Sequence, residues 1–239
     1  MKIRLEVHTH TKYSHDSSLN KWLYLFMLKI RKINTIAITD HNEISGAIEF
    51  KDFLERYGIN VIIGEEIFTN KGEVIGLFLS QKIEPGKSVR DTILEIKKQG
   101  GIVYIPHPYD EKRYKTVLPE EEIKNNIDLI DIIEIHNGRN ICSNFSDHQL
   151  SIANKYPSAL KLVGSDAHTF IELGRNYNII EQFNTPEEFI SNLKTVFFVK
   201  KDCIKFAHEI TRIVRFIKLL RKGDFNELQR IINRKLGKN

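Results

Sequence analysis

Short apolar segments typical of buried strands alternate along this chain with longer segments of helical periodicity. Several of them, such as 35–39 (TIAIT) and 102–106 (IVYIP), are apolar on both faces, which favours a parallel sheet covered by helices. The alternation therefore predicts an α/β fold, either a barrel or a doubly wound sheet. We expect strands near 2–7, 35–39, 60–64, 74–79, 102–106, 130–135 and 161–164, and helices near 20–32, 43–57, 88–99, 119–126, 144–156, 186–196 and 205–235.

Side chains that can bind metals follow six of the seven expected strands, always at the carboxyl end. One such pair, His8 and His10, could simply be exposed on one face of an edge strand. In a barrel, however, all these strand ends converge on one face. The presence of such side chains at six of the ends therefore predicts a metal site. Imidazoles and carboxylates suit Mn, Fe or Zn, and a carboxylate can bridge two ions. The residues are His8 and His10, Asp40 and His41, Glu65 and Glu66, His107, Glu134 and His136, and Asp166 and His168.

The composition fits one compact domain. Of 239 residues, 41% are hydrophobic, which is enough for a large core. The two cysteines, Cys142 and Cys203, are far apart and form no CxxC pair, so a cysteine metal site is not expected and a reducing cytoplasm is the default location. The N-terminus resembles a strand and not a signal peptide, and no apolar run has the length of a membrane span.

The excess of positive charge, a net +5, is concentrated near the C-terminus. We therefore expect a barrel domain over 1–204 and a basic helical extension over 205–239 that packs on it. A basic extension could contact nucleic acid or another polyanion, but a solvated basic face on a packed helix is the favoured interpretation.

Five short motifs together resemble the PHP (polymerase and histidinol phosphatase) family. They occur in the order that the family shows and span nearly 160 residues. No nucleophile elbow, P-loop or dinucleotide-binding motif competes with this interpretation. The resemblance implies a distorted TIM-like (β/α)7 barrel with up to three metal ions, and usually phosphoester hydrolysis. The motifs are HTH at 8–10, TDHN at 39–42, GEE at 64–66, HP at 107–108 and GSDAH at 164–168.

The resemblance also implies a ligand set for two to three divalent ions (Mn, Fe or Zn). Glu66 would bridge the first and second ions. His15, next to the ligand Asp16, would instead face substrate or solvent. The first ion would bind His8, His10, Glu66 and Asp166, the second Glu66 and His107, and the third Asp16, His41 and His168.

Two departures from the family pattern affect the expected site. Where members often carry a histidine before an apolar strand, this chain has Glu73, which can ligate the second ion or can be an exposed strand-edge residue. The 33 residues 74–106 fit one strand, a turn and one helix, so the lid that some members insert there is absent. We therefore expect an open site that accepts a short oligonucleotide at least as well as a mononucleotide.

The implied reaction is phosphoester hydrolysis by a metal-bridged hydroxide. Asp166 or a metal-site histidine such as His168 would orient the attacking water or accept its proton. Asp40, the third candidate catalytic residue, would support a neighbouring histidine or cap the next helix.

The substrate is expected to be a phosphorylated small molecule or a nucleic acid. Arg139, Lys112, Arg113 and Arg175 are candidate phosphate-binding residues, although each could be a surface charge without a substrate contact. Two other functions stay open: a regulatory or interaction module with little turnover, and amidohydrolase-like hydrolysis of a substrate without phosphate.

The helix expected at 20–32 contains seven consecutive apolar residues, 22–28 (WLYLFML). Packing against a barrel covers only part of such a helix, so another surface has to cover the rest. We expect the C-terminal helix to do so, with a homodimer as the alternative. The covering stripe would consist of Ile210, Ile213, Val214, Ile217 and Leu220.

Overall fold

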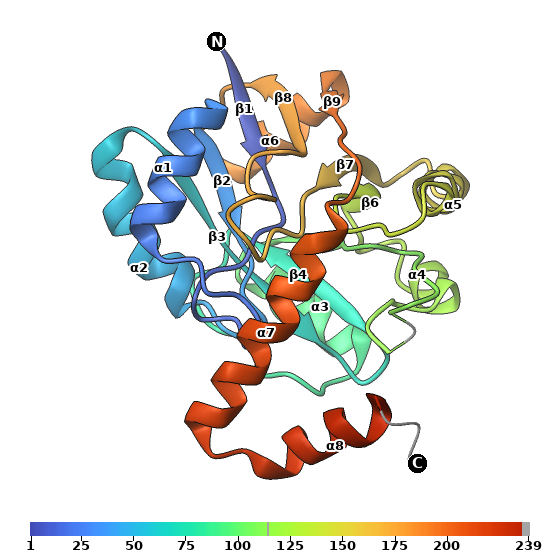
Figure 1. Cartoon of the computed structure of the whole chain (residues 1–239). Helices are drawn as coiled ribbons and strands as arrows, with labels where there is room; N and C mark the ends of the chain where they lie inside the picture. The colour runs from blue at the N-terminus through green and yellow to red at the C-terminus, as the bar shows by residue number, and fades with distance from the viewer. Residues whose placement is uncertain (114, 236–239) are drawn as a thin grey trace.

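The computed structural model describes residues 1–113 and 115–235. Over these residues nine strands form one strongly curved sheet, and helices cover its outside (Figure 1). The strand order is β7-β6-β5-β4-β3-β2-β1-β8-β9. The strands are β1 (Lys2–Glu6), β2 (Thr35–Ile38), β3 (Asn60–Phe68), β4 (Glu73–Leu77), β5 (Ile102–Ile105), β6 (Ile132–Asn137), β7 (Leu160–Gly164), β8 (Tyr177–Glu181) and β9 (Phe197–Val199).

The helices follow most of the strands, as the alternation in the sequence predicts. Two short 3-10 turns extend α2 and α6. The helices and turns are α1 (Lys21–Arg31), α2 (Ser45–Leu54), η1 (Glu55–Tyr57), α3 (Val89–Lys98), α4 (Glu120–Asn125), α5 (Asn144–Lys155), α6 (Pro186–Asn192), η2 (Leu193–Thr195), α7 (Lys205–Lys222) and α8 (Phe225–Lys235).

The fold is the expected barrel-like α/β fold, but the expected number of seven strands is wrong. The strands β8 and β9 were not expected, and β8 pairs antiparallel with β1. In addition, β3 and β4 form an antiparallel hairpin, so β4 is antiparallel to the neighbouring strand β3. The parallel pairs of the sheet are β1–β2, β2–β3, β5–β6 and β6–β7. Residues at the start of β4 therefore lie beside the carboxyl end of β3.

A side chain closes the barrel between strands β7 and β8. Among the described residues no backbone ladder joins β7 to β8. Instead, the amide of Asn178 on β8 accepts a hydrogen bond from the Val163 N–H (3.1 Å) and donates one to the Val163 carbonyl (2.8 Å). Because an amide side chain offers both a donor and an acceptor, it satisfies the buried edge of β7 as a neighbouring strand would.

Alternation along the strands separates an inner core from an outer one. On β1, Ile3 and Leu5 point into the barrel, where Phe189 of α6 packs against the same cluster. On β5, Tyr104 faces inward, whereas Val103 packs outward against the helices. This two-sided burial explains why these strands are apolar on both faces.

Local signals set the helix ends. The side chain of Asn20 accepts hydrogen bonds from the first turn of α1, and Lys32 ends that helix with a φ of 56°. The segment expected to form one helix over 205–235 forms α7 and α8, because Gly223 adopts a φ of +69° and ends α7.

The predicted packing of the C-terminal stripe on the helix near 20–32 is wrong. Trp22 and Phe26 on α1 are each 60% exposed, and Ile213 on α7 is 59% exposed. The buried positions of α7 are Ala207 and Thr211, on the other side of the helix. The face of α7 that carries Ala207 and Thr211 therefore lies against the barrel, in front of which the helix runs in Figure 1.

No helix among the described residues is long and apolar enough to cross a membrane.

Candidate metal centre

The candidate ligands converge at the carboxyl end of the parallel strands, because all the loops that carry them leave the barrel there. His8, His10 and Asp16 belong to the segment after β1, and His41 follows β2. Glu66 lies near the end of β3 and Glu73 starts β4, so the hairpin brings the two together. The remaining ligands are His107 after β5, and Asp166 and His168 after β7.

A first cluster consists of the four residues expected for the first ion. His8 Nε2 lies 3.3 Å from Glu66 Oε1 and 3.6 Å from Asp166 Oδ1. His10 Nε2 lies 3.4 Å from each of the same two carboxylates. The ring of each histidine thus reaches both acids, and one ion between them would contact all four side chains.

A second cluster contains Glu66, Glu73 and His107. His107 Nε2 lies 3.1 Å from Glu66 Oε1 and 3.5 Å from Glu73 Oε2. His41 Nδ1 approaches the same acids from the other side, at 3.0 and 3.7 Å. Glu73 is only 6% exposed, so the alternative of an exposed strand-edge residue is wrong.

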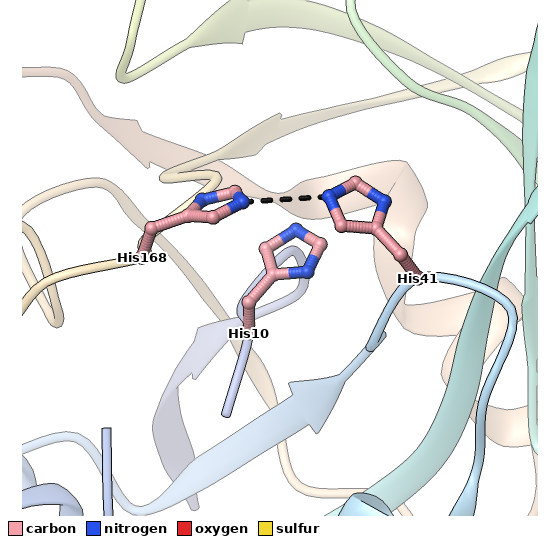
Figure 2. Close-up of side chains that lie close together, drawn as sticks. All are labelled: His10, His41 and His168. Carbon is pink, nitrogen blue, oxygen red and sulfur yellow. Dashed lines mark hydrogen bonds between the residues drawn. The ribbon is translucent and has the colours of Figure 1, made fainter. Parts of the chain in front are cut away.

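A third cluster joins Asp16, His41 and His168. His168 Nε2 lies 3.2 Å from Asp16 Oδ1 and 3.4 Å from His41 Nε2 (Figure 2). The ring of His10 stacks between the two other imidazoles, with centroid distances of 4.4 and 4.0 Å. His15 is half-exposed, and its Nε2 lies 3.8 Å from Asp16 Oδ2, at the rim of this cluster.

Buried polar atoms in these clusters show that the residues fit divalent cations. Within the described part of the chain, His8 Nε2, His10 Nε2, Asp16 Oδ1 and Glu66 Oε2 have no hydrogen-bond partner. A buried polar atom without a partner costs roughly 1–3 kcal/mol, and four at one point are unusual in a native protein. Cations bound between them would satisfy all four atoms at once.

Hydrogen bonds to Nδ1 fix the orientation of two candidate ligand rings, those of His8 and His10. The carboxylate of Glu134 contacts His8 Nδ1 at 3.3 Å, which leaves Nε2 directed at the first cluster. Ser14 Oγ contacts His10 Nδ1 at 3.0 Å and also donates to Asp40 Oδ1. Such contacts orient a metal-ligating imidazole and select its tautomer.

Asp40 contacts the loop between β1 and α1, which carries several candidate ligands. It is fully buried and accepts hydrogen bonds from Thr11 and Ser14, so it holds the loop that carries His10. The described residues that line the cavity do not include it. In the structure, Asp40 therefore contacts the site through the loop of Thr11 and Ser14.

Glu134 contacts the candidate ligands, whereas His136 does not. Besides His8, Glu134 accepts a hydrogen bond from the His107 N–H (2.6 Å). His136 instead contacts Ser146 and Asn176, in a polar network beside α5 and β9.

Mutual electrostatics keep the central carboxylates charged. Burial opposes ionisation of Glu66, but the charges of His8 and His41 outweigh it and hold its pKa well below the usual range. The pKa of Asp166 is lowered in the same way, against its burial, by Arg113 and His8. Burial and the neighbouring Glu66 raise the pKa of Glu73 to about 7. This concentration of negative charge suits cations that replace the protons on the imidazoles.

The backbone is strained at two ligands. His107 has a φ of 28° and Asp166 a φ of 53°, a region that residues with a Cβ seldom adopt. Strain of this kind costs about 1–3 kcal/mol and persists where the surroundings impose it. Here the His107 N–H is held by Glu134, so the ligand geometry is fixed before a cation binds.

Five of the candidate ligands lie at the floor of a cavity of about 740 Å³: Asp16, His41, Glu73, Asp166 and His168. The other four, His8, His10, Glu66 and His107, are buried and are not among the described lining residues. Lys112 and Arg113 line one wall, and Arg113 is paired with Asp166 and Asp110. Arg139 is 4% exposed and lines the cavity where β6 ends. Arg175 is not among the described lining residues, and it donates a hydrogen bond to the Asp202 carbonyl.

The α7 helix forms another wall, which sequence reasoning did not assign to the site. Its lining residues are Lys205, His208, Glu209, Arg212 and Arg215. The charge excess of this segment was visible in the sequence, but its position at the mouth of the barrel was not.

Comparison with known proteins agrees with this geometry. The uncharacterized protein MJ0417 of Methanocaldococcus jannaschii is 32% identical over 206 residues, which cover 80% of this chain and 79% of that protein. The uncharacterized protein MJ1587 of the same organism is 42% identical over 119 residues, 45% of this chain and 68% of that protein.

Solved structures share the fold at low identity. PsfC from Pseudomonas syringae PB-5123 is similar with a TM-score of 0.64 at 14% identity, covering 91% of this chain and 98% of that chain. A protein of Bifidobacterium adolescentis, described as a candidate metal-dependent phosphoesterase, has a TM-score of 0.58 at 16% identity and covers 69% of this chain and 87% of its own. An amidohydrolase from Chromobacterium violaceum, solved with bound sulfate, has a TM-score of 0.57 at 16% identity, covering 86% and 95%.

The model of the PHP domain family matches residues 6–197, a range that contains every candidate ligand from His8 to His168. Because this match spans most of the chain and the ligand clusters are assembled in the structure, the chain belongs to the PHP domain family.

Proposed function

We propose that this protein is a metal-dependent phosphoester hydrolase. The observation that carries the proposal is the meeting of two features in one cavity. The floor holds imidazoles and carboxylates of the candidate ligand set, and among the described residues the walls carry six Lys and Arg side chains. A cationic wall beside a metal floor suits an anionic phosphoester better than a neutral amide.

Bound divalent ions would supply activation of water and neutralisation of phosphoryl charge. Two to three such ions would be held by His8, His10, Glu66 and Asp166, by Glu66, Glu73 and His107, and by Asp16, His41 and His168.

The residues of the chain itself would bind and orient the phosphoryl group. Arg113 reaches Asp166 from the cavity wall, so a phosphate at the first cluster would lie beside its guanidinium. Arg139 Nη1 is buried and, in the described part of the chain, has no hydrogen-bond partner. Arg139 Nη1 and the remaining N–H groups of Arg113 can donate hydrogen bonds to phosphoryl oxygens, and Lys112 adds a third positive charge.

Asp166 and His168 would orient the attacking water and accept its proton. Arg113 and His8 hold the pKa of Asp166 well below its usual range, so its carboxylate stays charged and can accept a hydrogen bond from that water. His168 Nδ1 contacts the Asp166 carbonyl oxygen at 2.8 Å, which directs Nε2 at the third cluster.

The test is a parallel screen of protein purified with Mn²⁺ against phosphomonoesters, phosphodiesters, short oligonucleotides and amide substrates. We expect phosphoester turnover that is lost on chelation and in Asp166→Ala. Turnover of amides alone would replace this proposal with the amidohydrolase alternative. A folded, metal-loaded protein inactive on every substrate would favour the regulatory module.

A further inference from the structure

The polar side of α7 faces the cavity, although a surface helix normally buries its apolar side. Its exposed apolar residues include Phe206 at 68%, Ile213 at 59% and Leu220 at 46%. If the helix were rotated about its axis, these apolar side chains would be removed from water, which would stabilise its packing. The contacts of the polar side must offset that loss.

Two anchors hold α7 in this orientation. The Lys218 ammonium donates to the carbonyls of Lys12, Ser14 and Ser17, at 2.5 to 2.7 Å, and so uses all three of its protons on the loop that carries Asp16. The second anchor lies about two helical turns before Lys218. There, Thr211 Oγ1 accepts a hydrogen bond from Arg139 Nη2 (3.1 Å).

His208 joins the second anchor. Its Nδ1 lies 3.2 Å from Arg139 Nη2, and its Nε2 lies 3.3 Å from Cys203 Sγ. Burial, together with Arg139 and Arg113, lowers the pKa of His208 to about 4, so the ring is neutral and can accept from the guanidinium. The helix is thus fixed both to the metal-ligand loop and to the end of β6.

Basic side chains near these anchors project from one face of α7 into the cavity. Lys205, Arg212 and Arg215 follow helical spacing with His208, so they share one side. Arg212 is paired with Glu209 and Arg215 with Glu227, yet Arg215 Nε is buried without a hydrogen-bond partner among the described residues. Among the described lining residues outside the ligand clusters, two are acids, Asp110 and Glu209, and six are Lys or Arg.

This surplus of positive charge exceeds what one phosphoryl group needs. The ligand clusters, Arg113 and Arg139 would together surround one phosphate, and a cavity of about 740 Å³ has the size of sites that hold whole small molecules. Four of the six cations are paired with a carboxylate: Arg113 with Asp110 and Asp166, Arg139 with Glu172, Arg212 with Glu209, and Arg215 with Glu227. Lys112 and Lys205 have no carboxylate partner among the described residues, and an anion beside them would lower the electrostatic repulsion within the group.

Resting on the phosphoesterase function proposed above, we infer that α7 is a specificity element: Lys205, Arg212 and Arg215 bind a second anionic group of the substrate, separate from the phosphoryl group at the metals. The substrate is therefore a phosphoester with a second phosphate. That phosphate can belong to a small bisphosphate or to the next nucleotides of a chain, and both present the same chemistry to the helix.

The test uses the full-length, metal-loaded protein and the double variant Lys205→Gln/Arg212→Gln. Arg221→Gln/Lys222→Gln is the matched control, because it removes two charges from the exposed last turn of the same helix. Inhibition of p-nitrophenyl phosphate hydrolysis is measured with nucleoside 5′-monophosphate, nucleoside 3′,5′-bisphosphate and a 5′-phosphorylated oligonucleotide. Thermal unfolding shows that each variant is folded.

Two of the inhibitors, the bisphosphate and the oligonucleotide, carry a second phosphate. We expect the wild type and the control to bind the tighter of these two at least about 10-fold more tightly than they bind the monophosphate. In the double variant this ratio should fall to within about 2-fold of unity. If the oligonucleotide is the stronger inhibitor and its inhibition weakens steeply with salt, the second phosphate belongs to a nucleic-acid chain. If the bisphosphate is the stronger inhibitor, the second phosphate belongs to a small molecule. A ratio near unity in the wild type, or one unchanged in the double variant, overturns the inference.

Calorimetric titration of the same three compounds separates this inference from the proposed function. If no phosphoester is hydrolysed, the proposed function fails, while the binding ratios still decide whether α7 recognises a second phosphate.

Discussion

Replacement of Glu134 by glutamine probes how strongly the centre depends on contacts behind its ligands. The carboxylate is fully buried, and each oxygen has two partners. Oε1 contacts His8 Nδ1 (3.3 Å) and the Tyr104 hydroxyl (2.6 Å). Oε2 accepts from the His107 N–H (2.6 Å) and from Asn137 Nδ2 (3.0 Å).

Glutamine keeps the shape of this side chain but can accept on one side only. Whichever way the amide turns, two buried donors face an NH₂ group. Each unsatisfied donor costs about 1–3 kcal/mol, so Glu134→Gln should destabilise the fold by about 2–6 kcal/mol before relaxation. Loss of the contact to His8 should also weaken metal binding about 10- to 100-fold, the usual effect of removing such a partner.

The assay is competition for Mn²⁺ or Zn²⁺ with a coloured chelator, accompanied by thermal unfolding. Glu65→Gln is the matched control. Glu65 is the buried neighbour of the ligand Glu66 on β3, but it accepts from the Ile83 N–H (2.9 Å) and takes no part in the clusters. Metal affinity of Glu134→Gln within twofold of the control would refute the role assigned to Glu134.

Metal analysis of gently purified protein should give two to three ions per chain, and His8→Ala or Asp166→Ala should remove at least one ion and most activity; unchanged metal content in both variants would contradict the ligand assignment. Gly164→Ala should lower stability by about 1–3 kcal/mol and weaken metal binding, because its Cβ would collide with the Glu134 carboxylate and lie 2.9 Å from the His8 Cβ; unaltered melting and metal content would argue against this close packing. Burial raises the pKa of Glu6 to about 8, so the unfolded chain releases this proton above about pH 4.5 while the folded chain keeps it. Stability of the chelated protein should therefore fall as pH rises from about 4.5 to 8, and Glu6→Gln should flatten this fall in melts taken across that range; parallel curves for the two proteins would show that Glu6 is already ionised.

Much of the centre could be predicted because it depends on topology more than on packing. Alternation of strand and helix requires parallel strands, and parallel strands place their carboxyl ends together. His8, His41, His107 and Asp166 could therefore be assigned to one site from their places in the chain. Glu134 could be placed at the same end of the barrel for the same reason, but its position behind His8 and His107 came from the structure.

Glu73 shows where that reasoning stops. It stands at the start of a strand and not at the end, so a rule based on carboxyl ends leaves its role open. The antiparallel turn of β3 into β4 brings it beside Glu66, and the alternation of residues does not reveal the direction of a strand.

By itself the sequence indicated the α/β barrel class, most of the candidate ligand residues and the amphipathic character of the C-terminal segment. Only the tertiary structure decided which side of that helix faces the barrel. Periodicity shows which residues share a face, and hydrophobicity alone would bury the apolar one. The three carbonyls around Lys218 and the guanidinium of Arg139 come from segments distant in the chain, and their hydrogen bonds hold the polar face inward instead.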